Sequence, residues 1–380
     1  MSLLTFYNTY ERAFFLERLN RFVMTLETDS GGIIQAHVPN PGRMEEFCTD
    51  HHPFFVVPVK RGKYPYRVVS TRYQNRFVFL DTLKVNDIFA HLLAENCLPQ
   101  FPGAGQVRRE VTVGDSRFDF TFVHEQQNVI VEIKSCTLCH NGLAMFPDAP
   151  TLRGQKHLKA LERLALEKQA KTYVFFLILN ANAERFMPAV HIDLDYARRF
   201  LDAQHVICQA FKLNVRDPVS IDLASVQEVP IDMAAAQTHC HNKGSYLLVL
   251  ENPQDMTLTI GKLGSIRFLP GWYVYVGSAM NSLEARLKRH QRARKKHFWH
   301  IDYLASTEMR VKKVYPIRSA ERIETTLAHA IGAISDGVIP HFGASDAHEN
   351  SHLFYFTTVP LRKKTFMNVI FNAWTFSLVQ

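Results

Sequence analysis

Two acidic residues and a lysine lie on neighbouring predicted strands in the middle of the chain. Asp119 belongs to an apolar segment at residues 117–123, and Glu132 and Lys134 belong to a second one at residues 129–134. Side chains alternate along a strand, so Glu132 and Lys134 are expected on one face. The few polar residues between the segments predict a hairpin, which would bring Asp119 beside Glu132.

This combination of side chains is typical of a site that hydrolyses phosphodiester bonds. Carboxylates are suitable oxygen ligands for Mg²⁺ or Mn²⁺, and here Asp119 and Glu132 would be the metal ligands. A bound cation stabilises charge on a phosphate and helps to ionise a water molecule, which Lys134 would hold. The alternative is a surface ion pair, which contributes about 0–1 kcal/mol. We favour the site, because an ion pair does not explain why charged residues interrupt strands that are otherwise apolar.

The wider sequence resembles two known groups of proteins. The predicted order of helix, three strands, helix and strand, with its Asp…Glu-x-Lys motif, is similar to the PD-(D/E)XK nuclease superfamily. Over about residues 10–230 the chain also looks like the sugar fermentation stimulation protein A family. The motifs that carry this resemblance are residues 38–44 (Val-Pro-Asn-Pro-Gly-Arg-Met), 108–110 (Arg-Arg-Glu), 116–120 (Ser-Arg-Phe-Asp-Phe), 132–134 (Glu-Ile-Lys), 146–149 (Phe-Pro-Asp-Ala) and 153–158 (Arg-Gly-Gln-Lys-His-Leu). The resemblance implies an OB-like barrel joined to a PD-(D/E)XK domain, DNA binding, and Asp119, Glu132 and Lys134 as the catalytic set.

Basic and polar residues near these motifs are expected to contact the phosphates of a nucleic acid. The candidates are Arg18, Arg21, Asn40, Arg43, Arg117 and Lys156. Gln155 and Lys156 open the next predicted helix, where the superfamily often places a Gln or Lys near the metal; a merely solvated position is equally open. Glu110 is either a further metal ligand or a surface acid, and we favour the surface acid.

A second group of chemically suited residues lies in the C-terminal third of the chain. Tyr246 and Tyr275 fall in the patterns Gly-x-Tyr and Tyr-x-Gly, and Arg286, His290 and Glu324 follow in that order. A tyrosine and a histidine can orient or deprotonate a water molecule, and an arginine can neutralise a phosphate. The single carboxylate of Glu324 can hold one divalent cation. Each residue alone is more often structural, tyrosines in strands above all, but the ordered set favours a catalytic site.

This order resembles the GIY-YIG nuclease signature. Over about residues 243–357 the chain looks like a GIY-YIG-related family known as a domain of unknown function, on residues 271–279, 297–304, 342–346 and 351–355. Residues 281–300 contain seven basic residues and one acid. Charge runs are usually solvated faces, but this run adjoins a candidate phosphate site, so we expect it to bind a polyanion. The expected contacts are Lys288, Arg289, Arg292, Arg294, Lys295 and Lys296.

The rest of the chain supplies the elements that must position these groups. Short strands separated by turn residues predict a barrel at the start, and helical periodicity then alternates with apolar strands. We expect an α/β and α+β multidomain protein. Its predicted segments are an OB-like barrel at residues 1–80, a PD-(D/E)XK α/β domain at 81–230, a polar linker at 231–242, a GIY-YIG-like α+β domain at 243–360 and a helical tail, docked on its own protein, at 361–380.

The length and composition of the chain are those expected of a soluble protein with more than one domain. The 380 residues exceed the usual size of a single core. With 47% hydrophobic and 21% charged residues, the chain is not mainly disordered. The longest clean apolar run, residues 173–179, is too short to span a membrane. Six cysteines and no predicted secretory signal favour the cytoplasm. A net charge of +8 favours a polyanionic partner.

We therefore predict a DNA-binding protein that is an Mg²⁺- or Mn²⁺-dependent nuclease. The alternative is a non-catalytic DNA-binding regulator of sugar-metabolism gene expression that retains nuclease folds. A third interpretation is a protein-interaction scaffold with incidental basic charge. No membrane partner is expected. The preferred DNA structure, DNA against RNA, the active one of the two sites, the oligomeric state and the pathway stay open.

Overall fold

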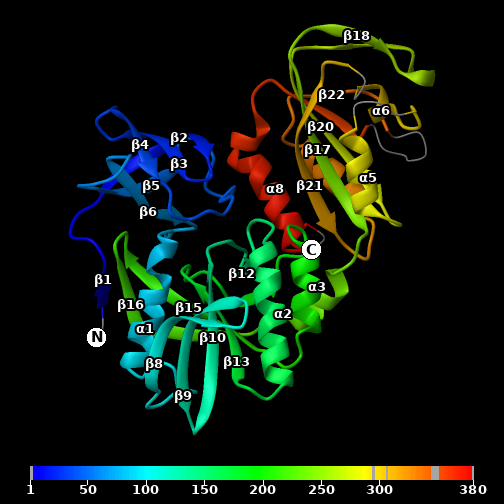
Figure 1. The fold of residues 1–380 in the computed structure, drawn as a ribbon. Helices are drawn as coiled ribbons and strands as arrows, with labels where there is room; N and C mark the ends of the chain where they lie inside the picture. Colours follow the sequence, from blue (N-terminus) through cyan, green and yellow to red (C-terminus); the bar gives the residue numbers. More distant parts are fainter. Residues whose placement is uncertain (1–2, 293–295, 305–306, 344–350, 379–380) are drawn as a thin grey trace. The chain divides into compact units, whose positions relative to one another are not determined.

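The computed structural model describes residues 3–292, 296–304, 307–343 and 351–378 (Figure 1). The chain forms two compact units, Met1–Gln237 and Thr238–Gln380. Their internal structures are described one at a time. No helix in these described ranges is long and apolar enough to cross a membrane.

A five-stranded barrel begins the N-terminal unit. Its strands are β2 (Glu11–Asn20), β3 (Val23–Thr28), β4 (Ile33–His37), β5 (Pro53–Pro58) and β6 (Tyr66–Tyr73). They follow the order β4-β3-β2-β5-β6, and a parallel pairing of β4 with β6 closes the barrel. Strand β7 (Arg76–Phe79) extends from β6. Alternating apolar residues fill the interior, for example Ala13 and Phe15 on β2, so the predicted OB-like barrel is confirmed.

A seven-stranded mixed sheet follows the barrel, in the order β1-β16-β15-β13-β10-β9-β8. Parallel pairing joins β10 to β13 and β13 to β15, and the other neighbours are antiparallel. The strands are β1 (Leu3–Thr5), β8 (Gly105–Val113), β9 (Ser116–His124), β10 (Gln127–Cys136), β13 (Lys171–Ile178), β15 (Ile207–Asp217) and β16 (Ser220–Val229). A small second sheet contains β11 (Cys139–His140), β12 (Leu143–Phe146) and β14 (Arg185–Pro188).

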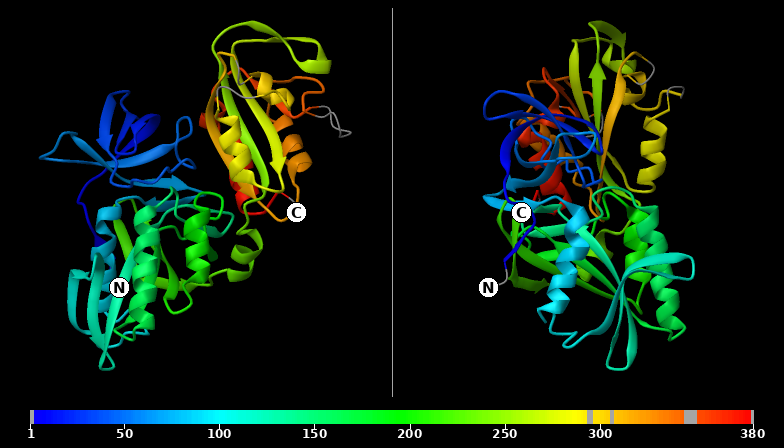
Figure 2. Two further views of the ribbon diagram at one scale, coloured as in Figure 1. Left: turned by 45° about the vertical axis from the view of Figure 1, so that its right-hand side comes forward. Right: turned by 60° about the vertical axis from the view of Figure 1, so that its left-hand side comes forward.

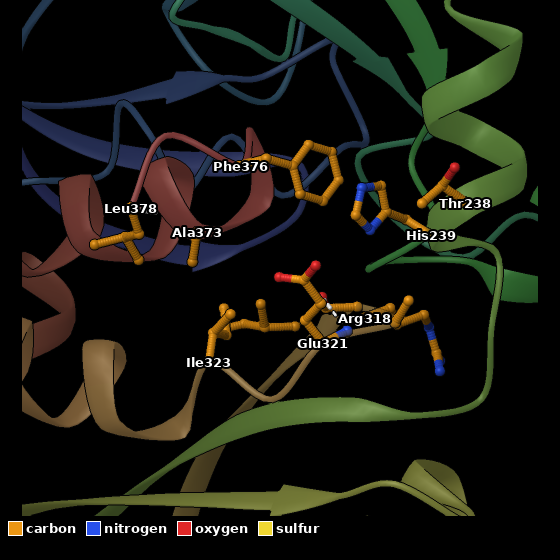
Figure 3. Close-up of a pocket in the computed structure, with 11 residues that line it drawn as sticks. Thr238, His239, Arg318, Glu321, Ile323, Ala373, Phe376 and Leu378 are labelled. Atoms are coloured by element: carbon orange, nitrogen blue, oxygen red, sulfur yellow. Dashed lines mark hydrogen bonds between the residues drawn. The ribbon is translucent and has the colours of Figure 1, made fainter. Parts of the chain in front are cut away.

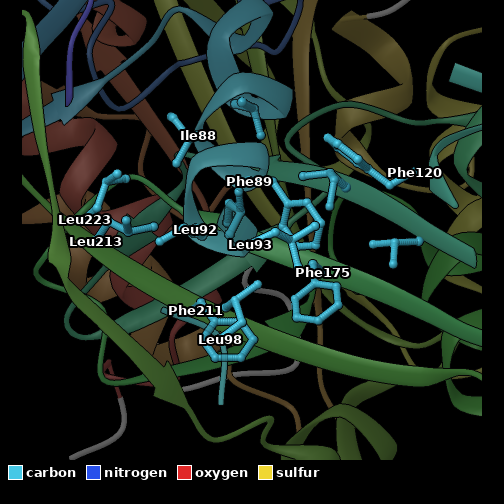
Figure 4. Packing of buried hydrophobic residues seen from close by; sticks show 14 of the residues in the cluster. Ile88, Phe89, Leu92, Leu93, Leu98, Phe120, Phe175, Phe211, Leu213 and Leu223 are labelled. Carbon is cyan, nitrogen blue, oxygen red and sulfur yellow. The ribbon is translucent and has the colours of Figure 1, made fainter. Parts of the chain in front are cut away.

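Helices cover both faces of the large sheet (Figure 2). Helix α1 (Val85–Ala94), which follows a short 3-10 turn η1 (Thr82–Lys84), packs on one face through Ile88, Phe89 and Leu92 (Figure 4). Helices α2 (Leu152–Leu166) and α3 (Leu194–Asp202) pack on the other face. Burial of central strands on both faces explains why β10 and β13 read as nearly continuous apolar runs.

The C-terminal unit is a five-stranded sheet in the order β21-β17-β20-β23-β22. Its strands are β17 (Gly244–Asn252), β20 (Gly271–Ala279), β21 (Arg310–Arg318), β22 (Gly337–Val338) and β23 (Leu353–Phe356), with a separate hairpin of β18 (Met256–Thr259) and β19 (Ser265–Phe268). The helical elements are η2 (Gly261–Leu263), α5 (Leu283–His290), α6 (His300–Leu304), α7 (Glu324–Gly332), η3 (Pro360–Arg362) and α8 (Lys364–Trp374). The predicted docking of the tail is confirmed, because Trp374 Nε1 donates to the carbonyl of Pro316 at 3.0 Å.

Several expected elements differ from those observed. The segment expected to be a polar linker contains helix α4 (Met233–His239). Its three alanines are strong helix formers, and Asp232 caps it by accepting the Ala235 N–H at 2.9 Å. The first strand, β1, pairs with β16 of the large sheet, although residues 1–80 were all expected to belong to the barrel.

Two acids meet where the segment between β4 and β5 approaches the end of β12. Glu46 is 4% exposed, and its Oε1 has no hydrogen-bond partner in the part of the chain that the structure describes. Asp148 packs so closely against Gly42 that a Cβ there would lie 1.7 Å from Asp148 Oδ2. Burial, followed by the neighbouring charge of Asp148, raises the pKa of Glu46 to about 8. Glu46 is therefore a protonated acid at neutral pH.

We expect Glu46→Gln to stabilise the N-terminal unit at neutral pH. Because the pKa of Glu46 is raised in the folded state, its contribution is most favourable at low pH and is lost as the pH rises towards about 8. One such group changes the free energy of unfolding by about 1.4 kcal/mol per pH unit within that window. Glutamine resembles the protonated acid and does not ionise, so the variant should lose less stability between about pH 5 and 8.

Urea unfolding followed by far-UV circular dichroism, at several pH values, measures this difference. Glu17→Gln, which changes an exposed acid on β2, is the control and should follow the parent protein. Parallel stability curves for the parent and Glu46→Gln would show that Glu46 is ionised in the folded protein.

Candidate functional site

Strand β9 leaves β10 at the point where Asp119 lies. Pairing of the two strands runs from Gln127–His124 to Val131–Phe120 and then stops. The next residue on β9, Asp119, accepts the Ile133 N–H of β10 through its side-chain Oδ2 at 2.7 Å. Its Oδ1 accepts a hydrogen bond from Asn86 Nδ2, in the first turn of α1, at 3.0 Å. The carboxylate of Asp119 therefore takes the place of a backbone partner in the gap between the strands.

Glu132 is buried directly beside this gap, with 3% of its surface exposed. Its Oε1 contacts Lys134 Nζ, as the strand alternation predicts, and His157 Nδ1 of α2 lies 2.5 Å from the same oxygen. Its Oε2 is buried and has no hydrogen-bond partner among the described residues. A buried carboxylate oxygen left in this way is costly unless something else binds it.

The two carboxyl groups have opposite pKa shifts. Burial, and then the nearby charge of Glu132, raises the pKa of Asp119. Burial also acts to raise the pKa of Glu132, but the positive charge of Lys134 and the hydrogen bond from His157 outweigh it and hold that pKa below its usual value. Closely placed acids with separated pKa values are common at functional sites.

The donor set fits a small divalent cation. Asp119 and the unpartnered Oε2 of Glu132 offer carboxylate oxygens, which Mg²⁺ and Mn²⁺ prefer. In the described ranges no group of three or more His, Cys, Asp or Glu residues is arranged to hold a metal. Mg²⁺ is often bound by only one or two carboxylates together with water and substrate phosphate, so a set of two is sufficient.

The neighbouring residues of α2 have different partners. Gln155 Nε2 donates to Asp193 at 3.2 Å, and Lys156 Nζ donates to the Asp115 carbonyl at 2.8 Å. The residue of α2 that reaches the acids is instead His157, which we did not predict. A metal role for Gln155 or a phosphate contact for Lys156 stays a prediction.

On the other side of the acids, Asn86 links Asp119 to Glu110, because its Nδ2 also lies 3.3 Å from Glu110 Oε1. Glu110 is exposed and forms an ion pair with Arg117 Nε at 2.8 Å. These contacts agree with a surface acid at position 110. The nucleic-acid contact of Arg117 stays a prediction.

The candidate phosphate-binding residues of the barrel fall into two groups. Arg18 donates to the carbonyls of Arg21, Asn40 and Arg43 and so supports the motif loop. Asn40 is buried; its Oδ1 accepts the Gly42 N–H at 2.9 Å and its Nδ2 donates to Thr137 at 3.3 Å. Arg21 and Arg43 have exposed side chains, which makes them the better placed of the four for a phosphate contact.

In the C-terminal unit, Tyr246 and Tyr275 lie on one face of the sheet, on the paired strands β17 and β20. The Tyr246 hydroxyl lies 2.8 Å from His290 Nε2 on α5. Gly277 stands opposite Tyr246, where a Cβ would lie 2.5 Å from the tyrosine ring. Burial raises the pKa of both tyrosines far above neutral, so their hydroxyls are protonated and are suited to donate hydrogen bonds.

Glu324 begins α7 and completes this cluster. It accepts a hydrogen bond from Ser278 Oγ, and His352 Nδ1 lies 3.1 Å from its Oε1. Burial acts to raise the pKa of Glu324, but the hydrogen bonds from His352 and Ser278 outweigh it and lower that pKa. Arg286 donates to the Ser278 carbonyl at 3.4 Å, and its charge acts on both tyrosines. The five predicted residues thus share one neighbourhood.

The basic run that begins in α5 is only partly a set of exposed charges. Lys288, Arg292 and Lys296 are exposed. Arg289 instead donates to the buried carboxylate of Asp302 at 2.6 Å. The predicted contacts Arg294 and Lys295 lie outside the described residues.

A separate pocket of about 260 Å³ in this unit contains none of the predicted site residues (Figure 3). Its wall is mostly apolar, and His239 stacks on Phe376 with ring centroids 3.7 Å apart. Arg318, at its edge, donates to Glu284 at 3.2 Å and to the His241 carbonyl at 3.4 Å. These contacts indicate a structural role for that guanidinium, so we assign no ligand to the pocket.

The closed barrel is followed by a mixed sheet with helices on both faces. Two strands of this sheet diverge and carry the Asp…Glu-x-Lys set, and these features define a PD-(D/E)XK nuclease-like fold. Family models match in the same order along the chain. The SfsA N-terminal OB domain matches residues 16–80, and the sugar fermentation stimulation protein RE domain matches residues 84–217. The domain of unknown function DUF123 matches residues 245–374. The chain belongs to the sugar fermentation stimulation protein family, and the predicted family and three-part fold are confirmed.

Individual relatives cover about half of this chain. The homolog from Desulfotalea psychrophila is 34% identical over 205 residues, which cover 53% of this chain and 86% of that protein. The homolog from Desulforamulus reducens is 37% identical over 177 residues, which cover 46% of this chain and 73% of that protein. The structure of SfsA from Pyrococcus furiosus in complex with Ca²⁺ is 27% identical, with a TM-score of 0.55, and covers 61% of this chain and 99% of that one.

We expect Gly277→Ala to destabilise the C-terminal unit, because its Cβ would overlap the buried Tyr246 ring. Overpacking of this kind costs about 1–3 kcal/mol. All three tryptophans of the chain, Trp272, Trp299 and Trp374, belong to this unit, so thermal unfolding followed by tryptophan fluorescence reports on it alone. Gly337→Ala is the control, since a Cβ there meets only ordinary contacts at 3.7 Å. Equal midpoints for the two variants would contradict the close approach at Gly277.

Proposed function

We propose that this protein is a divalent-cation-dependent nuclease that hydrolyses phosphodiester bonds in DNA. The observation that carries the proposal is the buried, unpartnered Oε2 of Glu132, beside the Asp119 carboxylate and next to Lys134. A structural ion pair would satisfy both oxygens, whereas a metal ligand keeps one available.

The residues of this first site have separate roles in the proposed reaction. Asp119 and Glu132 would hold the cation, which would neutralise phosphate charge and favour ionisation of an attacking water. The Ile133 N–H fixes one oxygen of Asp119, and His157 fixes one oxygen of Glu132. Lys134 reaches the same carboxylate and supplies positive charge for the water or for the scissile phosphate.

The C-terminal cluster is a second candidate for the same chemistry. Glu324 would hold a cation with one carboxylate, and Arg286 would neutralise a phosphate. The Tyr246–His290 pair would orient a water molecule. Here the carboxylate already accepts hydrogen bonds at both oxygens, from Ser278 and His352, so a cation would have to share it or displace a partner. This difference favours the first site as the catalytic one.

The comparisons support this proposal in two ways. The N-terminal unit matches an OB domain and the sugar fermentation stimulation protein RE domain, and OB folds commonly bind oligonucleotides. The related SfsA of Pyrococcus furiosus was solved with Ca²⁺, which like Mg²⁺ prefers oxygen ligands. The net charge of +8 favours attraction of a polyanion.

We expect purified protein to cut DNA in the presence of Mg²⁺ or Mn²⁺ and not in the presence of a chelator. Labelled single-stranded, duplex and branched DNA would be incubated with the parent protein, with Glu132→Gln, with Glu324→Gln and with the double variant. Loss of a ligand that positions the cation should lower the cleavage rate by on the order of 100-fold. A loss confined to Glu132→Gln would assign the activity to the N-terminal unit.

The controls separate catalysis from folding and binding. Glu251→Gln changes a half-buried acid paired with Lys312, outside both candidate sites, and should leave cleavage intact. Circular dichroism of each variant shows whether it is folded. DNA binding that persists in chelator, without cleavage under any metal, would sink the nuclease proposal and support the non-catalytic DNA-binding regulator.

A further inference from the structure

Two aromatic side chains stand exposed beside the C-terminal cluster. Phe298 is 72% exposed and Trp299 is 36% exposed, with ring centroids 6.2 Å apart. Large aromatic residues usually bury most of their surface, because each removes a large apolar area from water. An adjacent exposed pair therefore calls for a ligand that offers flat apolar faces.

The pair is held in place by a buried acid. The backbone N–H groups of Phe298 and Trp299 donate to Asp302 Oδ2 at 2.9 and 3.1 Å. Asp302 is completely buried, and Arg289 donates to the same oxygen at 2.6 Å and to the Lys296 carbonyl at 2.7 Å. These bonds fix the backbone beneath both rings, so little conformational freedom remains to be lost when a ligand binds.

Basic side chains lie beside both rings, and one of these side chains, Arg289, is paired with Asp302. The guanidinium carbon of Arg286 lies 3.9 Å from the centre of the Trp299 ring, and that of Arg289 lies 5.2 Å from the Phe298 ring. Lys296 is exposed just before the pair. A ligand with aromatic faces and a negatively charged backbone matches this arrangement, whereas an uncharged or cationic partner does not.

Trp299 also connects the surface to the candidate site. Its ring centroid lies 6.2 Å from that of His290, whose Nε2 contacts the Tyr246 hydroxyl. Arg286, which stacks on Trp299, also donates to the carbonyl of Ser278 beside Glu324. A strand with its phosphate at this cluster would therefore place a neighbouring base within reach of the rings.

We propose that Phe298 and Trp299 form a stacking site for unpaired bases, so that the C-terminal unit binds single-stranded nucleic acid or the unpaired part of a branched structure. Bases inside a duplex are already stacked on one another and cannot offer their faces. This inference rests on nucleic-acid binding by the chain but not on cleavage.

The test measures binding of the full chain in chelator, so that no cleavage occurs. The probes are fluorescein-labelled dT15, rU15 and a blunt 15-base-pair duplex; the DNA and RNA strands show which backbone is accepted. Trp299→Ala and Phe298→Ala should each weaken binding of a single strand roughly tenfold, the size of one lost base–aromatic stack. Binding of the duplex should change less than about twofold.

Conservative variants keep this test independent of folding. Trp299→Phe retains a ring and should keep most of the affinity, while the fluorescence quenching caused by a base stacked on Trp299 should disappear. Leu269→Ala, which removes another exposed apolar side chain of this unit, should bind like the parent protein. Circular dichroism confirms that each variant is folded.

The possible results separate this inference from the nuclease proposal. Equal losses on single strands and duplex, or no loss on either, would overturn the stacking site even if the protein cuts DNA. A loss that depends on Trp299 and Phe298 and is specific to single strands would establish the site even if no metal supports cleavage. No binding to any probe would overturn the stacking site and would leave the nuclease proposal to the cleavage assay.

Discussion

The hydrogen bond from the Ile133 N–H to the side chain of Asp119 is the contact on which the first site depends. Antiparallel strands normally satisfy such a donor with a backbone carbonyl, but β9 has already turned away from β10 at this position. The gap admits a carboxylate without leaving a buried donor unpaired. It also explains the packing of β9, since Phe120 lies in the core beneath α1 whereas Phe118 lies in the core beneath α2.

The positive groups near this gap compensate only one of the two carboxylate oxygens of Glu132. Lys134 and His157 both contact Oε1 of Glu132, and none of the described residues bonds to Oε2. This compensation lowers the pKa of Glu132 although the residue is buried. Asp119 accepts hydrogen bonds from the neutral donors Ile133 N–H and Asn86 Nδ2, and its pKa is raised. A further positive charge near Oε2 would favour the ionised form of both groups, which is the effect expected of a bound cation.

Much of this site follows from local rules of the sequence, and the remainder does not. Strand alternation and one hairpin suffice to predict Asp119, Glu132 and Lys134 together, because all three lie within 16 residues along the chain. Asn86 and His157 come from helices on opposite faces of the sheet, and their reach depends on how each helix is rotated. Periodicity shows which face of a helix is apolar but not which polar residue at its edge meets a strand.

The C-terminal cluster contains similar kinds of residues to the first site, but its charges are compensated differently. Its tyrosines are buried and neutral, its glutamate is compensated by hydrogen bonds to both oxygens, and its arginine stacks on an exposed tryptophan. This arrangement provides fewer available ligands for a cation than the gap between β9 and β10, but it provides flat surfaces and positive charge at the edge of the cluster. Recognition of a strand and cleavage of a strand make different demands on buried charge. In the roles proposed above, the N-terminal unit would cleave the strand and the C-terminal unit would hold it.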